Sequence, residues 1–312
     1  MASGLQVEVV ATAIPRPVQL ALTSSGLLVV LGHGREGAAE LFWLDPADPL
    51  PIRGPGIPRV VVPFSPGPRK TVFGSLAVHP RTGDLFLGEE NGNRIYRLTV
   101  EHRLTPIAVG LNHLVGGSSI AFDGEGRLVL LDFASPETQL RSEAPPPPVL
   151  EWLAHEAYRG PLVFRIDPDA NPRLPHRLDV LPPLFPSGWG IHASREPLHR
   201  FISVAAAPAG DLLLLDSLGQ LWRWSGAGDL HLVVRLPSGH YHRTNIALAP
   251  DGTVFVSTGF HIRRLLRVDR AGAVTTVAWN LGDPGGIVVD AAGALYLAET
   301  ALHRIIRIRP GP

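Results

Sequence analysis

Six segments of the chain repeat one pattern, and this repeat constrains the fold more than any other feature of the sequence. Each segment contains an apolar strand, a tight turn, a second apolar strand, a polar loop and a third strand, within about 40 residues. The last copy, residues 284–308, shows the pattern most clearly. One small residue in the first strand marks each copy: Ala21, Ala77, Ala121, Ala205, Ala247 and Val288. Because one segment cannot bury its own apolar face, neighbouring segments must pack on one another.

The strands and turns predict an all-β fold. Turn sequences such as Asp251-Gly252 and Ala292-Gly293 supply the positive φ angles that tight hairpins need. Fourth strands are expected at 59–62, 106–109, 177–181, 230–236 and 274–279. The sixth segment lacks one, and residues 5–12 can supply it. The sequence therefore predicts a six-bladed β-propeller with four-stranded antiparallel blades, in which 1–312 form a single domain and the N-terminal strand closes the last blade.

A long insertion interrupts the third segment. Residues 133–160 separate its second strand from its third, and they contain four consecutive prolines after Ala144. Residues 149–158 have a helix-forming composition and an apolar stripe. In a propeller such a loop emerges on the face where the channel opens to ligands. We therefore expect 133–160 to form a lid over that face.

Composition excludes several classes of partner and chemistry. Hydrophobic residues make up 45% of the chain, enough for a large core, and the formal net charge is zero. A chain without excess positive charge is not drawn to nucleic acid or to anionic membranes. There is no cysteine, which excludes disulfides and thiolate sites. With no leader or long apolar run in the sequence as given, we expect a cytoplasmic monomer without nucleic-acid or membrane partners.

Two segments resemble NHL repeats. Residues 91–98 and 286–300 are similar to the pattern Gly-Ile-Ala-Val-Asp, Gly, Ile-Tyr-Val-Ala-Asp, Asn-Arg-Ile. The whole chain resembles the six-bladed superfamily that contains NHL proteins, gluconolactonase-like lactonases, strictosidine-synthase-like enzymes and peptide-amidating lyases. The resemblance implies the architecture rather than one chemistry, because that superfamily contains both enzymes and pure binding modules.

The resemblance to lactonases implies a divalent cation held by an acid of the first blade and by Asn and Asp at the starts of later inner strands. The equivalent positions in this chain hold no carboxylate: Val18, Gly74, Ser118, Ile202, Thr244 and Gly285. We therefore expect the lactonase metal site to be absent, unless the inner strands shift by one residue and Asn245 turns inward.

Four acids recur at the ends of the second strands: Glu89, Asp132, Asp216 and Glu299. Carboxylates at one height around a channel raise one another's pKa and can act as general acid and base. The alternative is structural, because in NHL-type repeats this acid binds backbone N–H groups of the following loop. Glu89 is the strongest catalytic candidate of the four, since Glu90 doubles the charge beside it.

His240 and His242 are candidate partners for these acids. Two histidines spaced in this way in an extended segment point in the same direction, as in some zinc sites. His192 or His113 could supply a third ligand, as in the amidating lyases. We expect no cofactor, with zinc or another divalent cation as the alternative to histidines that only form hydrogen bonds.

Aromatic and polar side chains on the same face predict a ligand site. The candidate ligand-binding residues are Trp152, His155, Trp189, His192, Tyr241, Asn245 and Phe260. Aromatic loops above a polar channel suit a small, partly apolar molecule, although they could equally pack the lid onto the ring. The sequence favours a small-molecule-binding propeller that acts as a hydrolase, a lyase or a related biosynthetic enzyme by acid–base chemistry. The alternative is a non-catalytic propeller that binds a ligand or a protein partner.

Overall fold

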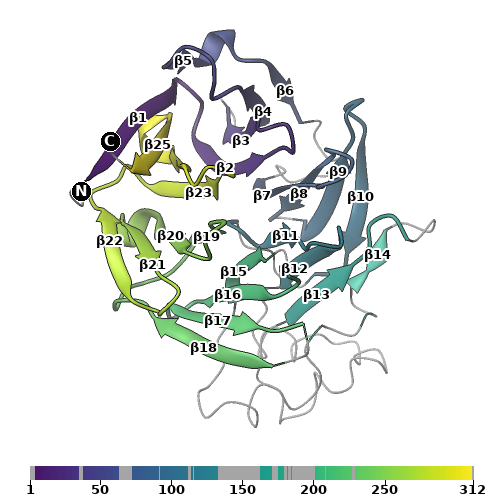
Figure 1. Ribbon diagram of the computed structural model, residues 1–312. Coiled ribbons are helices and arrows are strands. Elements are labelled where there is room, and N and C mark those ends of the chain that lie inside the picture. Colours follow the sequence, from purple (N-terminus) through teal and green to yellow (C-terminus); the bar gives the residue numbers. More distant parts are fainter. Residues whose placement is uncertain are drawn as a thin grey trace.

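Six sheets form a ring around a central axis in the computed structural model (Figure 1), as the repeat predicts. The structure describes residues 4–34, 38–62, 72–90, 92–111, 114, 116–132, 162–170, 175–178, 181, 184, 201–207, 209–226 and 229–310. The molecule is a six-bladed β-propeller with almost no helix in these residues. The predicted lid, 133–160, lies outside them.

Each blade begins with a strand next to the axis and continues outward. Blade 1 comprises β2 (Pro17–Leu22), β3 (Leu28–His33), β4 (Ala39–Leu44) and β6 (Arg59–Val61). Blade 2 comprises β7 (Phe73–Val78), β8 (Leu85–Glu89), β9 (Arg94–Leu98) and β10 (Leu104–Val109). Blade 3 comprises β11 (Ile120–Phe122), β12 (Leu128–Asp132) and β13 (Leu162–Ile166).

The second half of the ring is more regular. Blade 4 comprises β15 (Phe201–Ala206), β16 (Leu212–Asp216), β17 (Gln220–Trp224) and β18 (Leu230–Arg235). Blade 5 comprises β19 (Asn245–Leu248), β20 (Val254–Ser257), β21 (Leu265–Val268) and β22 (Val274–Ala278). Blade 6 comprises β23 (Pro284–Val289), β24 (Leu295–Glu299), β25 (Arg304–Pro310) and β1 (Leu5–Thr12). A short helix, α3 (Gly259–Ile262), follows β20.

The N-terminal strand closes the ring, as predicted. β1 pairs with β25 in antiparallel register, from Leu5 opposite Pro310 to Thr12 opposite Arg304. An ion pair of 2.6 Å between Glu8 and Arg307 supports this pairing. A two-residue strand, β5 (Ile52–Arg53), adds to β1 in parallel orientation and covers its outer edge.

The predicted fourth strand of blade 3 is wrong. The described residues of the range 177–181, namely 177, 178 and 181, do not pair with β13. A short strand, β14 (His176–Arg177), instead pairs in parallel with β10 of blade 2. The described part of blade 3 therefore has three strands. The apolar pattern correctly indicated burial, because Leu178 is fully buried. Leu178 packs in the interface between blades 2 and 3 and not in a fourth strand of blade 3.

Tight turns and inter-blade packing explain why the sequence folds this way. A glycine with φ between +76° and +90° occupies each of the six turns between first and second strands. The described core consists of six hydrophobic clusters, and each cluster joins two neighbouring blades. Phe86 of blade 2, for example, packs with Leu128 of blade 3. Each blade is thus stabilised by both neighbours, which makes ring closure a condition for stability.

Hydrogen bonds also connect every blade to the next at the channel. Five of the six junctions use a side chain, and the sixth uses two backbone groups. The pairs are His33 with the Phe73 carbonyl, Ser75 with Ser119, Val204 N–H with the Ser118 carbonyl, Ser203 with the Thr244 carbonyl, Ser257 with the Gly285 carbonyl, and Thr300 with the Pro17 carbonyl. Buried carbonyls at the starts of the inner strands are satisfied in this way.

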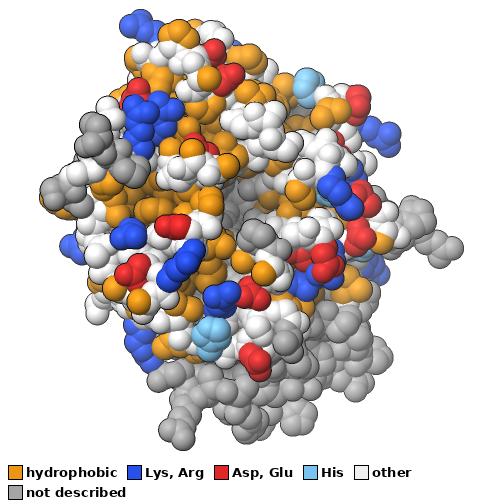
Figure 2. Space-filling model, viewed as in Figure 1, with side chains coloured by type: hydrophobic (Ala, Val, Ile, Leu, Met, Phe, Trp, Pro, Cys, Tyr) orange, Lys and Arg blue, Asp and Glu red, His pale blue; other side chains and the backbone are white. Residues whose placement is uncertain are grey.

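Surface charge is mixed. Acidic and basic side chains are interspersed on the face shown in Figure 2 and do not gather into a patch of one sign. In the part of the chain that the structure describes, no helix is long and apolar enough to span a membrane.

Candidate functional site

A cavity of about 370 Å³ opens where the inner strands of the ring begin. Residues of blades 1, 2, 3, 5 and 6 line it, so that segments far apart in the sequence meet there. Six of the lining side chains are charged or can become so: Arg16, His33, Glu90, His242, Arg243 and Asp283. We call this the channel-mouth cavity.

Three of these residues adopt a left-handed backbone conformation. The φ angles are +36° for Arg16, +51° for Arg243 and +57° for Asp283. Each residue lies one or two positions before an inner strand, in blades 1, 5 and 6 respectively. Blade 3 has Gly117, with φ +127°, in a comparable place. Glycine adopts such angles without strain, whereas an L-residue with a side chain does so at a cost.

Glu90 and Arg243 form an ion pair of 2.9 Å in this cavity. The Glu90 side chain is 14% exposed and the Arg243 side chain is 50% exposed. The Glu90 carboxylate lies against the backbone of Gly74 and Gly116, where a Cβ atom on either glycine would overlap it. These two glycines therefore provide the space that places Glu90 inside the cavity.

Asn245 reaches the axis, which answers the question that the sequence left open. Its Oδ1 accepts hydrogen bonds from Gln19 Nε2 at 2.7 Å and from Ser118 Oγ at 3.2 Å. Asn245 and Gln19 are 1% and 4% exposed, so blades 1, 3 and 5 are joined by a buried polar contact. Its own strand, β19, pairs with β20 without a register shift, from Asn245 opposite Ser257 to Leu248 opposite Val254.

The lining residues do not fit the divalent cation that lactonases hold. The Asn245 oxygen already accepts two hydrogen bonds, and Glu90 is neutralised by Arg243. Two arginines line the same cavity, which disfavours a bound cation. No group of three histidines or acids that could hold a metal occurs among the described residues.

His33 and Asp283 have shifted pKa values with identifiable causes. Burial lowers the pKa of the His33 imidazole below 6.5, and nearby Arg16 and Arg243 lower it further. Its Nε2 lies 2.7 Å from the Phe73 carbonyl, which can only accept, so Nε2 carries the proton and Nδ1 is the basic nitrogen of the neutral ring. Burial raises the pKa of the Asp283 carboxyl above 3.8, although three neighbouring arginines act in the opposite direction.

The four repeated acids do not line this cavity. Asp216 is fully buried, accepts hydrogen bonds from the N–H groups of Leu218 and Gln220 at 2.9 and 2.8 Å, and accepts another from Trp222 Nε1 at 3.2 Å. Glu299 likewise accepts from Gly282 N–H at 2.8 Å and pairs with Arg304 at 2.6 Å. Both therefore have the geometry of the structural alternative, in which the acid holds a loop.

Glu89 and Asp132 are also buried, at 6% and 1% exposure. The Glu89 carboxylate faces Gly92 rather than the cavity. Successive residues point to opposite sides of a strand, so Glu90, one position further, is the acid that enters the channel mouth. A catalytic role for the four acids stays a prediction that this geometry does not favour.

The histidine pair is near the cavity. His242 lines it, whereas His240 is exposed and stacks with His242, with ring centroids 6.0 Å apart. The ring centroid of His261 lies 4.4 Å from that of His240, and Phe260 is 3.9 Å from His261. The proposed third zinc ligands, His113 and His192, lie outside the described residues.

The candidate ligand-binding residues divide into three groups. Asn245 and Phe260 line the cavity. Tyr241 does not: it is 2% exposed, its hydroxyl donates to the Pro237 carbonyl at 2.6 Å, and burial raises its pKa to about 12. Tyr241 therefore belongs to the core between blades 4 and 5. Four further candidates lie outside the described residues: Trp152, His155, Trp189 and His192.

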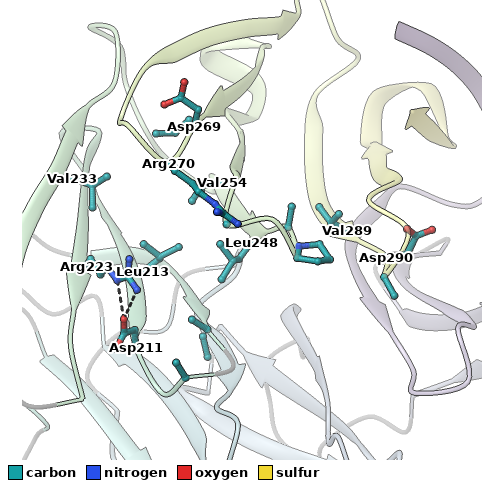
Figure 3. Close-up of a pocket in the computed structure, with 18 residues that line it drawn as sticks. Asp211, Leu213, Arg223, Val233, Leu248, Val254, Asp269, Arg270, Val289 and Asp290 are labelled. Atoms are coloured by element: carbon teal, nitrogen blue, oxygen red, sulfur yellow. Dashed lines mark hydrogen bonds and ion pairs between the residues drawn. The ribbon is translucent and has the colours of Figure 1, made fainter. Parts of the chain in front are cut away.

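A larger cavity, of about 760 Å³, lies at the opposite ends of the inner strands (Figure 3). Its walls are mainly apolar and come from blades 4, 5 and 6. The charged groups there already have partners: Arg223 pairs with Asp211 at 2.5 Å, and Arg270 donates to the Asp251 carbonyl. Asp269 and Asp290 accept hydrogen bonds from turn N–H groups. These side chains are occupied in holding turns, so the channel-mouth cavity is the better candidate for a functional site.

The sequence analysis did not select five of the charged or titratable cavity residues as site residues: Arg16, His33, Glu90, Arg243 and Asp283. His33 ends β3 and the other four lie beside strands, and only contacts between distant blades bring them together. One signal was available in the sequence: charged residues directly precede the inner strands that begin at Pro17 and Pro284.

Comparison with known proteins identifies the architecture. No model of a known protein family matches the chain, and no curated protein matches its sequence. Solved structures match over nearly the whole chain. A gluconolactonase from Xanthomonas campestris has a TM-score of 0.62 and 15% identity, covering 99% of this chain and 91% of that one. A carbohydrate-active enzyme of Trichoderma reesei has a TM-score of 0.61 and 11% identity, covering 99% and 97%.

A catalytically inactive virginiamycin B lyase from Staphylococcus aureus, solved with quinupristin, has a TM-score of 0.54 and 12% identity, covering 97% of this chain and 98% of that one. These neighbours are propeller enzymes, and at such low identities they share the fold alone with this chain. The chain therefore has the six-bladed fold of gluconolactonases and streptogramin lyases, as the resemblance implied.

Proposed function

We propose that this chain is an enzyme that binds a small molecule in the channel-mouth cavity and acts on it by acid–base catalysis, as a lyase or a hydrolase. The observation that carries the proposal is the left-handed conformation of Arg16, Arg243 and Asp283 around one cavity. Each such residue costs on the order of 1 kcal/mol or more, and strained residues cluster at active sites. Nine residues other than glycine have positive φ in the described part of the chain, and three of the nine line this one cavity with charged side chains.

His33 and Asp283 are suited to opposite roles. The His33 ring has Nδ1 as the nitrogen that can accept a proton, and burial raises the pKa of the Asp283 carboxyl, which favours the protonated form that a general acid needs. In a lyase, the base takes a proton from carbon beside a carbonyl, the carbon–oxygen bond to the leaving group breaks, and Asp283 protonates the departing oxygen. In a hydrolase, the base takes the proton from water instead.

Other lining groups position the substrate. Among the six catalytic candidates from the sequence, His242 lines the cavity and serves as a second base or donor. Phe260 and Asn245 complete the wall, Phe260 with an aromatic surface and Asn245 with a fixed polar group. The lyase and the gluconolactonase among the structural neighbours support this class of reaction.

Turnover of a substrate panel tests the proposal. The panel contains lactones, aryl esters and carbonyl compounds with a leaving group on the β carbon. Asp283→Asn and His33→Gln should each lower the rate by about 100-fold or more, the usual contribution of a general acid or base. Asp48→Asn is the matched control, because Asp48 is exposed on a loop outside the cavity. Rates unchanged by both cavity substitutions would refute the proposal, and binding without turnover would support the non-catalytic alternative.

A further inference from the structure

Arg16 is held firmly by its backbone, while its side chain remains at the cavity rim. Its N–H donates to His303 Nδ1 at 3.0 Å, and its carbonyl accepts from His33 N–H at 3.3 Å. Contacts with blade 1 and blade 6 thus fix the residue in its left-handed conformation. The side chain is exposed and lines the cavity.

The two cavity arginines differ in their charge partners. Arg243 is paired with Glu90 at 2.9 Å. The Arg16 guanidinium forms no hydrogen bond or ion pair with any residue that the structure describes. The other acid of the cavity, Asp283, interacts with Arg16 electrostatically but forms no ion pair with it. Of the two cavity arginines, Arg16 is therefore the one whose guanidinium has no ion-pair partner among the described residues.

We infer that the ligand of the channel-mouth cavity is a small monocarboxylate whose anionic group binds the guanidinium of Arg16. This inference rests on the proposed function, because it concerns the same site. A guanidinium presents two parallel N–H groups that match the two oxygens of a carboxylate. One free arginine balances one negative charge, which fits a carboxylate better than a doubly charged phosphate.

The remaining walls suit an apolar body on this acid. Phe260 is 46% exposed and lines the cavity, so its ring offers apolar surface to a ligand. Gln19 and Asn245 are already hydrogen-bonded to each other, which leaves Arg16 as the stronger anchor. The expected class is an aryl or alkyl monocarboxylate.

Paired probes separate charge recognition from binding in general. The full chain is titrated at low salt with a panel of aryl and alkyl monocarboxylates, such as phenylacetate, and with the matching primary amides, such as phenylacetamide. We expect each acid that binds to do so about tenfold more tightly than its amide, since a hydrogen bond to a charged group contributes more than a neutral one. Arg16→Gln should remove this preference by weakening acid binding much more than amide binding, whereas Arg16→Lys should retain part of it.

Arg53→Gln is the control, because Arg53 is an exposed arginine on β5 at the outer edge of blade 6. It should leave binding unchanged. The inference is overturned if acids and amides bind equally, if Arg16→Gln leaves acid binding intact, or if no acid of the panel binds. A competition experiment tests the kind of anion: the inference is also overturned if inorganic phosphate displaces phenylacetate at lower concentration than acetate does. Equal binding of acids and amides, abolished by Asp283→Asn, would overturn the charge preference while the proposed site remained.

Discussion

Glu90 and Arg243 meet at 2.9 Å across the channel mouth although 153 positions separate them in the chain. The contact joins blade 2 to blade 5 and places a carboxylate and a guanidinium in the cavity. The sequence pattern had selected the neighbouring residue, Glu89, as the candidate. Glu89 ends β8 and its carboxylate stays outside the cavity, whereas Glu90, one position later in the following turn, places its carboxylate in the cavity.

Substituting these two neighbours in turn tests the assignment. Glu90→Gln removes a partly exposed ion pair, so the free energy of unfolding should fall by less than about 1 kcal/mol, while ligand binding or turnover should change. Glu89→Gln should leave the cavity unchanged. Chemical unfolding and ligand titration on both variants measure the difference. A ligand effect of Glu89→Gln with none for Glu90→Gln would contradict the placement.

The hydrogen-bond ring around the channel predicts a stability effect at Thr300. Its hydroxyl donates to the Pro17 carbonyl at 2.6 Å between blades 6 and 1, and the residue is 7% exposed. Thr300→Val keeps the shape but removes this donor, so it should lower the free energy of unfolding by about 1 to 3 kcal/mol. Thr275→Val, at an exposed position on β22, should change it by less than about 0.5 kcal/mol. Equal effects in urea unfolding would refute the role of the ring.

Most of the fold could be predicted because repeated patterns are local. The alternation of apolar residues and the glycine turns identified β24, β25 and their equivalents, and the missing strand of blade 6 identified β1. The exception was β14, where buried Leu178 supplied a strand-like pattern that serves the interface between two blades. An apolar run shows that a residue is buried, but it does not say against which sheet.

The site was harder to predict because it depends on contacts between distant residues. The repeat drew attention to Asp216 and Glu299, whose recurrence reflects the loops they hold. Arg16 and Asp283 do not recur as a motif, and their placement depends on left-handed backbone angles that a sequence does not display. The inward position of Asn245 was foreseen only as an alternative, since its partners, Gln19 and Ser118, lie on other blades.

Ring closure predicts a large effect for a small change in β1. Val10 is fully buried between blades 6 and 1. Val10→Ala leaves a cavity in this interface, so we expect a loss of about 2 kcal/mol in the free energy of unfolding. Val61→Ala is the control, because Val61 is 53% exposed on the edge strand β6. Thermal and urea unfolding of both variants check the prediction, which fails if the two lose equal stability.

The pKa of Asp283 predicts how stability changes with pH. Burial raises this pKa above 3.8 in the folded protein, so the folded state retains the proton to higher pH than the unfolded state does. Stability should therefore fall as pH rises from below 3.8 through the folded-state pKa. Asn cannot ionise, so Asp283→Asn should gain stability relative to the unmodified protein over this range and keep the gain at neutral pH.

Asp251 provides a control of opposite sign, because the Thr253 N–H lowers its pKa below 3.8. Asp251→Asn should lose stability at neutral pH, and the loss should vanish as pH falls through the folded-state pKa. Urea unfolding over a pH series measures both slopes. Parallel curves for Asp283→Asn and the unmodified protein would show that ionisation of the half-buried Asp283 carboxyl does not lower stability.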